Sequence, residues 1–200
     1  MIGLLDYGIS NIRSVRKAFD HLGVPTELVN GPAAVGRYPK LVLPGVGAFA
    51  PGMDGLRRYN LTDSINEVVR EGTPLLGICL GMQFLFDYSL EDGQHQGLGL
   101  IPGVVTRFPQ MDLSVPHIGW NKLFIHQESP LLSGIEPGDY GYFVHSYVCR
   151  PADPEAVIAY TNYGEDFAAV VSQGNVFGVQ FHPEKSQAVG LSILKNFASL

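Results

Sequence analysis

A cysteine between two glycines is the first feature of this sequence that could do chemistry. Residues 74–76 are apolar, and Cys79 then lies between Gly77 and Gly81, where a helical pattern begins. A strand, a one-residue peak and a helix would hold the thiol above a sheet, as a thiol version of the Gly-x-Ser-x-Gly nucleophile elbow. The helix would aim its N-terminal N–H groups at the sulfur and favour thiolate. The alternative is a buried structural cysteine at a strand end.

A second stretch offers the base that such a thiol needs. Residues 176–181 alternate like a strand and end in His182-Pro183-Glu184. His182 could accept the thiol proton, and Glu184 could hold the tautomer of the imidazole. Pro183 restricts the backbone between them. His-Pro-Glu alone is more often a turn, but together with Cys79 it predicts a Cys-His-Glu catalytic triad.

Attack of a thiol on an amide creates an oxyanion, which needs hydrogen-bond donors already in place. The N–H of Leu80, directly after the nucleophile, is one candidate. We expect the other from Val46 and Gly47, in a Pro-Gly-Val-Gly segment that follows the expected strand 40–43. Glycines there let the backbone approach a ligand closely. A tight strand-to-helix turn would use the same residue types.

These motifs resemble the signatures of class I (triad) glutamine amidotransferases. The resemblance covers nearly the whole chain, from Asp6 to the last helix. It implies hydrolysis of the glutamine side-chain amide and transfer of the ammonia to a second active site. It also implies that the oxyanion strand lies at residues 44–47. This chain departs from the many relatives with Pro-Gly-Gly, because Val46 occupies the third place.

Other segments are similar to those of a narrower group, the glutaminase subunits of imidazole glycerol phosphate synthases of histidine biosynthesis. They are residues 116–121 (PHIGWN) and 142–147 (YFVHSY). The resemblance implies a heterodimer with a cyclase/synthase subunit built on a (β/α)8 barrel, which makes imidazole glycerol phosphate and an aminoimidazole carboxamide ribotide. It also implies a partner-facing set, namely Asn11, Trp120, Tyr142 and Lys185. Without the family, His117 and His145 would be packed or hydrogen-bonded residues.

The resemblance also suggests which residues bind glutamine: Gly45, Gln83, Glu91, Ser146 and Tyr147. A zwitterionic head group needs acceptors for its ammonium and donors for its carboxylate, and these residues can supply both. Gln83 follows Cys79 by one helical turn, which brings it within reach. Glu91 lies in an expected loop, where a solvated surface carboxylate is the alternative.

Two other functions remain open. One is the glutaminase subunit of another ammonia-transfer pathway, such as pyridoxal phosphate synthesis, against which the segments of Val46 and Trp120 count. The other is a catalytically silent relative that serves as a binding module, against which the intact triad counts. The sequence has no phosphate-cradling glycine-rich loop with Lys and Ser/Thr, so we expect another polypeptide to use the ammonia.

The elements that must position these residues follow from the hydrophobic pattern. Strands are expected at 2–6, 26–29, 40–43 and 74–79, and helices at 12–22, with Ser10 as N-cap, and at 56–71, broken near Asn60. Strand, helix and strand with short links predict a parallel sheet. Short strands follow at 104–108, 122–125, 142–148, 157–161, 168–171 and 176–181, and a helix at 186–200.

The predicted fold is therefore α/β: one flavodoxin-like amidotransferase domain over residues 1–200. It has a central, mostly parallel sheet, helices on both faces and an antiparallel extension. The catalytic groups would lie at the carboxyl ends of the strands, where open α/β sheets bind ligands.

Composition excludes several classes. The chain has 200 residues, 46% hydrophobic and 16% charged, which suits one globular domain. A formal net charge of −6 argues against a nucleic-acid surface, and no apolar stretch is long enough to span a bilayer. The N-terminal segment lacks a signal-peptide pattern. Two cysteines, Cys79 and Cys149, make no secreted disulfide framework. We expect a cytoplasmic protein without metal or cofactor.

Overall fold

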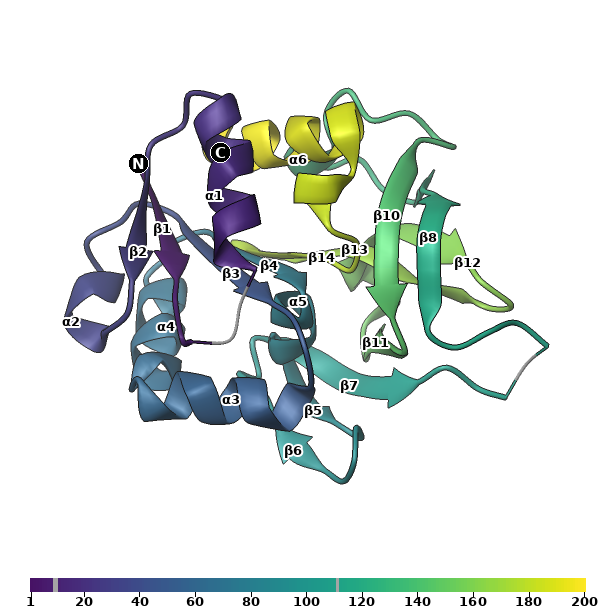
Figure 1. The fold of residues 1–200 in the computed structure, drawn as a ribbon, viewed down its shortest axis with the longest axis horizontal. Coiled ribbons are helices and arrows are strands. Elements are labelled where there is room, and N and C mark those ends of the chain that lie inside the picture. The colour runs from purple at the N-terminus through teal and green to yellow at the C-terminus, as the bar shows by residue number, and fades with distance from the viewer. Residues whose placement is uncertain (9–10, 111) are drawn as a thin grey trace.

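Figure 1 shows the computed structural model of the chain, which describes residues 1–8, 11–110 and 112–200. Its main sheet has eight strands, in the order β2 (Thr26–Val29), β1 (Ile2–Leu5), β3 (Leu41–Gly45), β4 (Leu75–Cys79), β14 (Val176–Val179), β13 (Asp166–Gln173), β12 (Val157–Asn162) and β9 (Phe124–Ile125). Neighbouring strands are parallel from β2 to β14 and antiparallel from β14 to β9. The predicted α/β class is confirmed.

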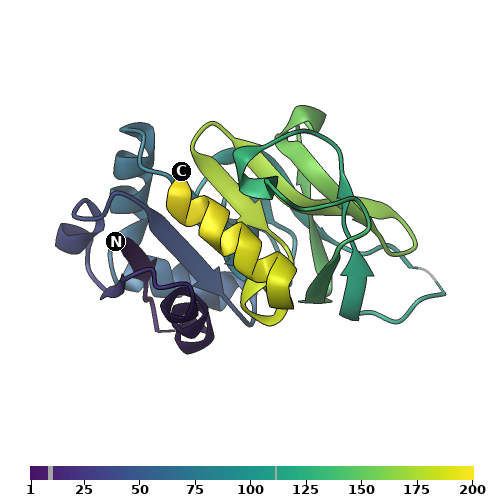
Figure 2. The same ribbon diagram turned by 90° about the horizontal axis from the view of Figure 1, so that it is seen from above.

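Helices cover both faces of the parallel half. α1 (Ile12–His21) and α6 (Gln187–Ser199) lie on one face, and α3 (Phe49–Arg58) and α4 (Leu61–Arg70) lie on the other (Figures 1 and 2). Each face has its own apolar core, because a sheet of buried parallel strands must be covered twice. Phe19 of α1 and Phe197 of α6 belong to one core, and Met53 of α3 and Ile65 of α4 to the other. The N-cap expected at Ser10 lies outside the described residues.

The third helix begins earlier than the sequence indicates, at Phe49 rather than near Leu56. Gly52 and Gly55 obscured it, since glycine is a poor helix former. Both are needed for packing: a Cβ on Gly52 would overlap the ring of Phe84, and one on Gly55 would lie 2.9 Å from the ring of Tyr7. The predicted break is confirmed, because Asn60 has φ 55° and separates α3 from α4. A short helix, α2 (Pro32–Val35), was not predicted.

Two smaller sheets complete the fold. One has the order β11 (Tyr147–Pro151), β7 (Ile101–Arg107), β5 (Phe86–Ser89) and β6 (His95–Gln96), and the other pairs β10 (Tyr140–His145) with β8 (His117–Lys122). The prediction of a single strand at 142–148 is wrong, because β10 ends at His145 and β11 begins at Tyr147. The chain leaves β8 and joins β7 at Ser146, and no glycine or proline marks that change of partner. Three short 3-10 helices also occur, η1 (Pro130–Leu132), η2 (Pro154–Ala156) and η3 (Pro183–Lys185).

Three strand ends meet at the centre of the main sheet and position the site. β4 lies between β3 and β14, and Gly45 at the end of β3 is paired with Cys79 at the end of β4. The chain after β14 reaches His182 within three residues. Segments that are far apart in sequence therefore meet at one edge, as parallel sheets require. Within the described residues, no helix is long and apolar enough to cross a membrane.

Candidate active site

Cys79 occupies the turn between β4 and the five-residue helix α5 (Leu80–Phe84). Its backbone has φ 54° and ψ −110°, a conformation that a residue with a side chain rarely adopts and that marks functional sites. The flanking glycines are required by space: a Cβ on Gly77 would lie 2.5 Å from the carbonyl oxygen of Gly81, and one on Gly81 would overlap the carbonyl of Leu43. The turn therefore holds the thiol above the sheet.

The helix after Cys79 is shorter than predicted. α5 ends at Phe84, and the chain then enters β5. A helix of five residues has a small dipole, so it contributes little to thiolate stability.

His182 and Glu184 form a buried pair across the same pocket from Cys79. The Nδ1 of His182 lies 2.8 Å from Oε1 of Glu184, and the exposed fraction of the two side chains is 6% and 0%. Burial lowers the pKa of His182, but hydrogen bonds to Cys79 and Glu184 and the charges of both groups outweigh it and raise the pKa to about 10. With Nδ1 held by the carboxylate, Nε2 is the nitrogen left for chemistry.

Asn11 lies behind this pair. Its side-chain amide donates to Oε1 of Glu184 at 3.1 Å, from the start of α1. The second carboxylate oxygen of Glu184 is buried and accepts no hydrogen bond among the described residues. The structure therefore gives Asn11, expected on the partner-facing surface, a direct contact with Glu184.

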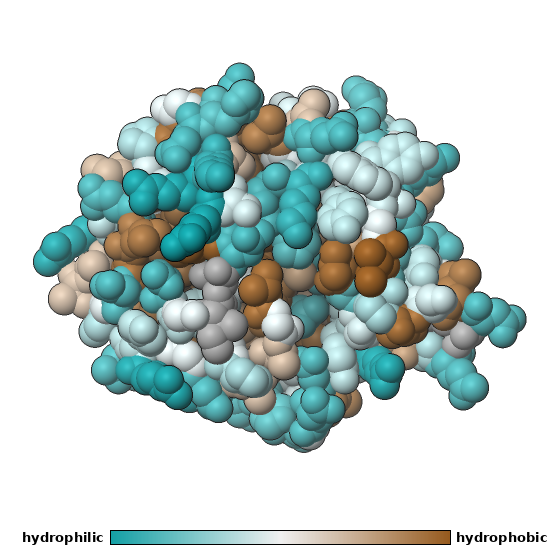
Figure 3. All heavy atoms as spheres, in the orientation of Figure 1, coloured by the Kyte–Doolittle hydropathy of each residue, from teal (hydrophilic) through white to brown (hydrophobic). Residues whose placement is uncertain are grey.

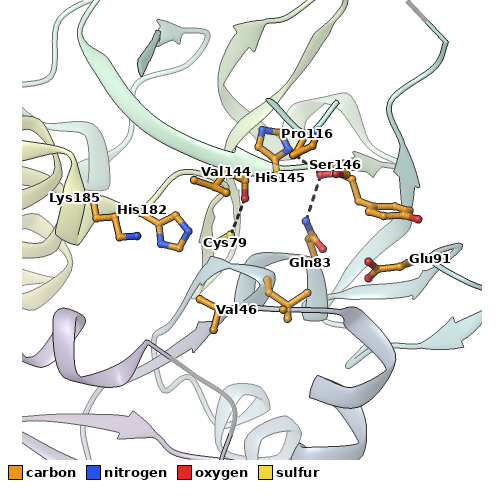
Figure 4. A pocket seen from close by; sticks show the side chains of 13 residues that line it. Val46, Cys79, Gln83, Glu91, Pro116, Val144, His145, Ser146, His182 and Lys185 are labelled. Carbon is orange, nitrogen blue, oxygen red and sulfur yellow. Dashed lines mark hydrogen bonds between the residues drawn. The ribbon is translucent and has the colours of Figure 1, made fainter. Parts of the chain in front are cut away.

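A pocket of about 370 Å³ opens over the thiol, within the size range of small-molecule sites. It is lined by Val46, Gly47, Cys79, Leu80, Gln83, Glu91, Pro116, Val144, His145, Ser146, Tyr147, His182 and Lys185. Figure 4 shows Cys79 between His182 on one side and Gln83 and Glu91 on the other. Of the predicted glutamine-binding residues, the lining includes all but Gly45.

The segment after β3 approaches the elbow closely. A Cβ on Gly45 would lie 2.7 Å from the backbone nitrogen of Gly81, so only glycine fits there. Gly47 has φ 94°, which also favours glycine. The hydroxyl of Tyr7 donates to the carbonyl of Pro44 at 2.9 Å and fixes the start of this segment. Val46 and Gly47, which follow in this segment, line the pocket.

The family of the chain follows from comparison with known proteins. The sequence model of the family described as "Glutamine amidotransferase class-I" matches residues 3–199. The chain belongs to the class-I glutamine amidotransferase family.

Several relatives that match this amidotransferase over its whole length share one name. This amidotransferase is 50% identical to "Imidazole glycerol phosphate synthase subunit HisH" of Geobacillus thermodenitrificans, in an alignment that covers 100% of this chain and 96% of the relative. It is 48% identical to the protein of that name from Syntrophotalea carbinolica, with all of both chains covered, and 47% identical to that from Salinibacter ruber, with 100% and 94% covered.

Solved structures show the same fold. A chain described as "Crystal structure of glutamine amidotransferase" aligns with a TM-score of 0.77 and 23% identity over 100% of this amidotransferase and 99% of that chain. The structure of PurLQS from Thermotoga maritima aligns with a TM-score of 0.77 and 20% identity, and the alignment covers 99% of this amidotransferase and 97% of that chain.

Two hydrogen bonds in the amidotransferase site were not predicted. The carboxylate of Glu91 accepts from the backbone nitrogen of Phe49 at 2.7 Å and so contacts the start of α3. Gln180, in the loop after β14, donates its amide to the sulfur of Cys79 at 3.9 Å. A glutamine inside the otherwise apolar stretch 176–181 was the signal that could have revealed it. No metal-binding cluster of His, Cys, Asp and Glu occurs in residues 1–8, 11–110 and 112–200.

Proposed function

We propose that the chain is the glutaminase subunit of an imidazole glycerol phosphate synthase, in which Cys79, His182 and Glu184 hydrolyse glutamine to glutamate and ammonia. One observation carries the proposal. A cysteine in an elbow with positive φ shares a small pocket with His182, whose Nδ1 is held by a buried carboxylate. This is the arrangement of a nucleophile, a base and an orienting group.

The first half of the reaction makes a thioester. The thiolate of Cys79 attacks the side-chain amide carbon of glutamine, the C–S bond forms, and the carbonyl electrons move onto oxygen. The tetrahedral intermediate then collapses, the C–N bond breaks, and Nε2 of His182 donates its proton to the leaving nitrogen. The raised pKa of His182, about 10, keeps that proton available at neutral pH. Ammonia leaves, and the acyl group remains on sulfur.

The second half releases glutamate. Neutral His182 accepts a proton from water as the water oxygen attacks the thioester carbon, and the C–S bond breaks. The thiolate and the imidazolium are restored, and the product leaves as a carboxylic acid that loses its proton to water. The cycle therefore consumes glutamine and water and yields glutamate, ammonia and one proton. Glu184 stabilises each imidazolium state from its buried position 2.8 Å away.

The oxyanion of both intermediates would be bound by backbone N–H groups. Leu80 directly follows the nucleophile, and Val46 and Gly47 line the same pocket. Loss of one such donor costs on the order of 10²–10³-fold in rate. Glycine on each side of Val46 gives this peptide two accessible orientations, so the oxyanion hole can be completed or left half-built. We propose that partner and synthase substrate complete it.

Glutamine itself would lie along the rest of the pocket, beside Gln83, Glu91, Ser146 and Tyr147. One oxygen of Glu91 is bonded to the backbone of Phe49, which orients the carboxylate and leaves the other oxygen for the substrate ammonium. The amide nitrogen of Gln83 donates to the carbonyl of Tyr147 at 3.3 Å, which leaves its own carbonyl as an acceptor. Gly45 shapes the pocket floor without lining it.

The partner surface would lie beside the pocket, on the outer face of the β8–β10 ladder. Exposed apolar side chains gather there: Ile118, Trp120, Tyr140 and Val144. Figure 3 shows apolar atoms over the lower end of β10 on the face toward the viewer. Large apolar side chains on a surface mark interaction sites. Val144 and Lys185 also line the pocket, so a synthase subunit docked here would cover its mouth and retain the ammonia.

The test is a comparison of two nitrogen sources. Cys79→Ala in the complex with the synthase subunit should abolish glutamine-dependent product formation and leave ammonia-dependent formation intact, because free ammonia bypasses this site. Cys149→Ala is the matched control, since Cys149 is also a buried, free cysteine but does not line the pocket. Substantial glutamine turnover by Cys79→Ala would exclude the proposed nucleophile.

A further inference from the structure

Gln180 is a polar side chain in an apolar place. It is fully buried, at 0% exposure, and follows the central strand β14. A buried amide is tolerated only when its hydrogen bonds are satisfied. Its Nε2 lies 3.9 Å from the sulfur of Cys79, and its Oε1 accepts from Nε2 of Gln83 at 3.4 Å.

The sulfur of Cys79 has two polar neighbours besides His182, and they act in opposite directions. The carbonyl oxygen of Val144 lies 4.0 Å away and can accept a proton from the thiol, which favours the neutral form. The amide N–H of Gln180 can only donate to sulfur, which favours thiolate. Besides His182, the amide of Gln180 is a second side-chain donor within reach of the sulfur.

We propose that Gln180 is a positioning residue for the nucleophile, whose amide N–H holds Cys79 as an oriented thiolate. The inference rests on the proposed function of Cys79 and adds to it a fourth side chain outside the triad. It requires that the amide of Gln180 keep its nitrogen, and not its oxygen, toward sulfur.

A chain of buried hydrogen bonds fixes that orientation. Nε2 of Gln83 donates to the carbonyl of Tyr147 at 3.3 Å and to Oε1 of Gln180, so the oxygen of Gln180 is already engaged. The carbonyl of Tyr147 also lies 2.9 Å from Nδ1 of His145. A carbonyl can only accept, so Nδ1 of His145 must carry a hydrogen.

The series of hydrogen bonds continues from His145 away from the pocket, and the donor and acceptor of each bond follow from the one before. Neutral His145 has one N–H, so its Nε2 accepts, and Nδ1 of His117 at 3.0 Å must donate to it. Nε2 of His117 then accepts from the amide of Asn121 at 3.2 Å. Burial lowers the pKa of His145 to about 3 and that of His117 to about 4, so both stay neutral and their tautomers stay fixed.

This series of hydrogen bonds ends in β8, beneath the proposed partner surface. His117 stacks on Phe143 and Tyr163, with ring centroids 5.0 and 4.0 Å apart, so its ring has little freedom to turn. The amide of Asn121 also donates to the backbone carbonyl of Asn162 at 2.9 Å. The chain therefore anchors the amide of Gln180 to the rigid β8–β10 ladder.

The test uses Gln180→Met, which keeps the length of the side chain and removes the donor. Two readouts are measured on the full chain and on its complex with the synthase subunit: the rate of Cys79 alkylation by iodoacetamide, and kcat and KM for glutamine. Both the alkylation rate and kcat should fall about 10- to 100-fold, the range for a hydrogen bond to a charged group, while KM stays within about threefold. Gln173→Met, the same change at an exposed site on β13, should change neither.

A second variant tests the series of hydrogen bonds that holds the amide of Gln180. His117→Phe keeps the stacked ring outside the pocket and removes the N–H to His145, so it should lower the alkylation rate, and its effect should not add to that of Gln180→Met. Thermal melting of each variant, with Leu132→Ala as a remote destabilised control, separates lost stability from lost reactivity. If Gln180→Met does not fold, an unchanged alkylation rate in His117→Phe overturns the proposal.

The outcomes also separate this inference from the proposed function. A wild-type complex that neither hydrolyses glutamine nor loses iodoacetamide labelling of Cys79 when glutamine is added would refute the glutaminase itself. A wild-type complex that does both, with Gln180→Met at wild-type alkylation rate and kcat, would refute only the role of Gln180.

Discussion

Replacing Glu184 by glutamine removes one negative charge from the catalytic pair and little else. Oε1 of Glu184 accepts from both His182 and Asn11, so the amide oxygen of the glutamine will take that position. The tautomer of His182 is then preserved. The amide nitrogen takes the place of the buried oxygen that has no partner among the described residues. Glu184→Gln therefore removes the charge and places an amide N–H donor at the position of the second carboxylate oxygen.

The magnitude follows from the pKa of His182. Despite burial, it rises from 6.5 to about 10, a difference of 10 − 6.5 = 3.5. At about 1.4 kcal/mol for each pKa unit, this is a net stabilisation of the imidazolium of about 5 kcal/mol, by which the attraction of Cys79 and Glu184 exceeds the cost of burial. If Glu184 supplies about half, its loss lowers kcat by about 10²-fold. The upper limit for an orienting carboxylate is about 10⁴-fold.

The assay is glutamine hydrolysis by the complex at saturating glutamine, as a function of pH. The pKa of His182 is raised, so the imidazolium that protonates the leaving ammonia is present below about 10 and is lost as pH rises through that value. Its contribution to folding stability is likewise complete below 6.5 and lost toward 10. Glu184→Gln should move this alkaline loss of activity to lower pH and leave KM within about threefold.

Glu128→Gln is the matched control, because Glu128 is exposed and lies outside the pocket. It should leave both kcat and the pH profile unchanged. An unchanged kcat in Glu184→Gln, or an alkaline limb that moves to higher pH, would show that Glu184 does not stabilise the imidazolium.

Two further results are expected. Lys185→Ala should weaken the complex by about 2–5 kcal/mol if its ammonium pairs with a partner carboxylate at the covered mouth of the pocket, and titration calorimetry would detect this; full affinity together with full ammonia transfer would place the interface elsewhere. The isolated chain should hydrolyse glutamine on the order of 10²–10³-fold more slowly than the substrate-bound complex, because in our proposal the peptide between Val46 and Gly47 completes the oxyanion hole only in that complex; equal rates in the two would contradict this.

The chemistry of the site could be predicted because it depends on short local patterns. Gly77 and Gly81 around Cys79 are forced by the space of the elbow, and His182 lies two residues before Glu184. The bounds of β2 were also predictable, because Gly23 ends the preceding helix and residues 30–32, Asn-Gly-Pro, turn the chain directly after Val29.

Other features have no local signal. Ser146 separates two strands because the residues before it pair with β8 and those after it pair with β7. Neither β8 nor β7 is adjacent to this stretch in the sequence. The helix after Cys79 ends at Phe84 because the chain pairs with β7 and β6 directly afterwards. Both outcomes depend on strands that are remote in sequence.

The sequence by itself indicated the proposed nucleophile and base, and it determined the alternation of strands and helices, because each follows from residue types at fixed short spacings. Only the tertiary structure decided what surrounds them. Asn11 reaches Glu184 across 173 positions, and Gln180 reaches Cys79 across 101. The physical reason is that a parallel sheet brings distant strand ends to one edge, and hydrogen bonds between those ends depend on distances that no local pattern encodes.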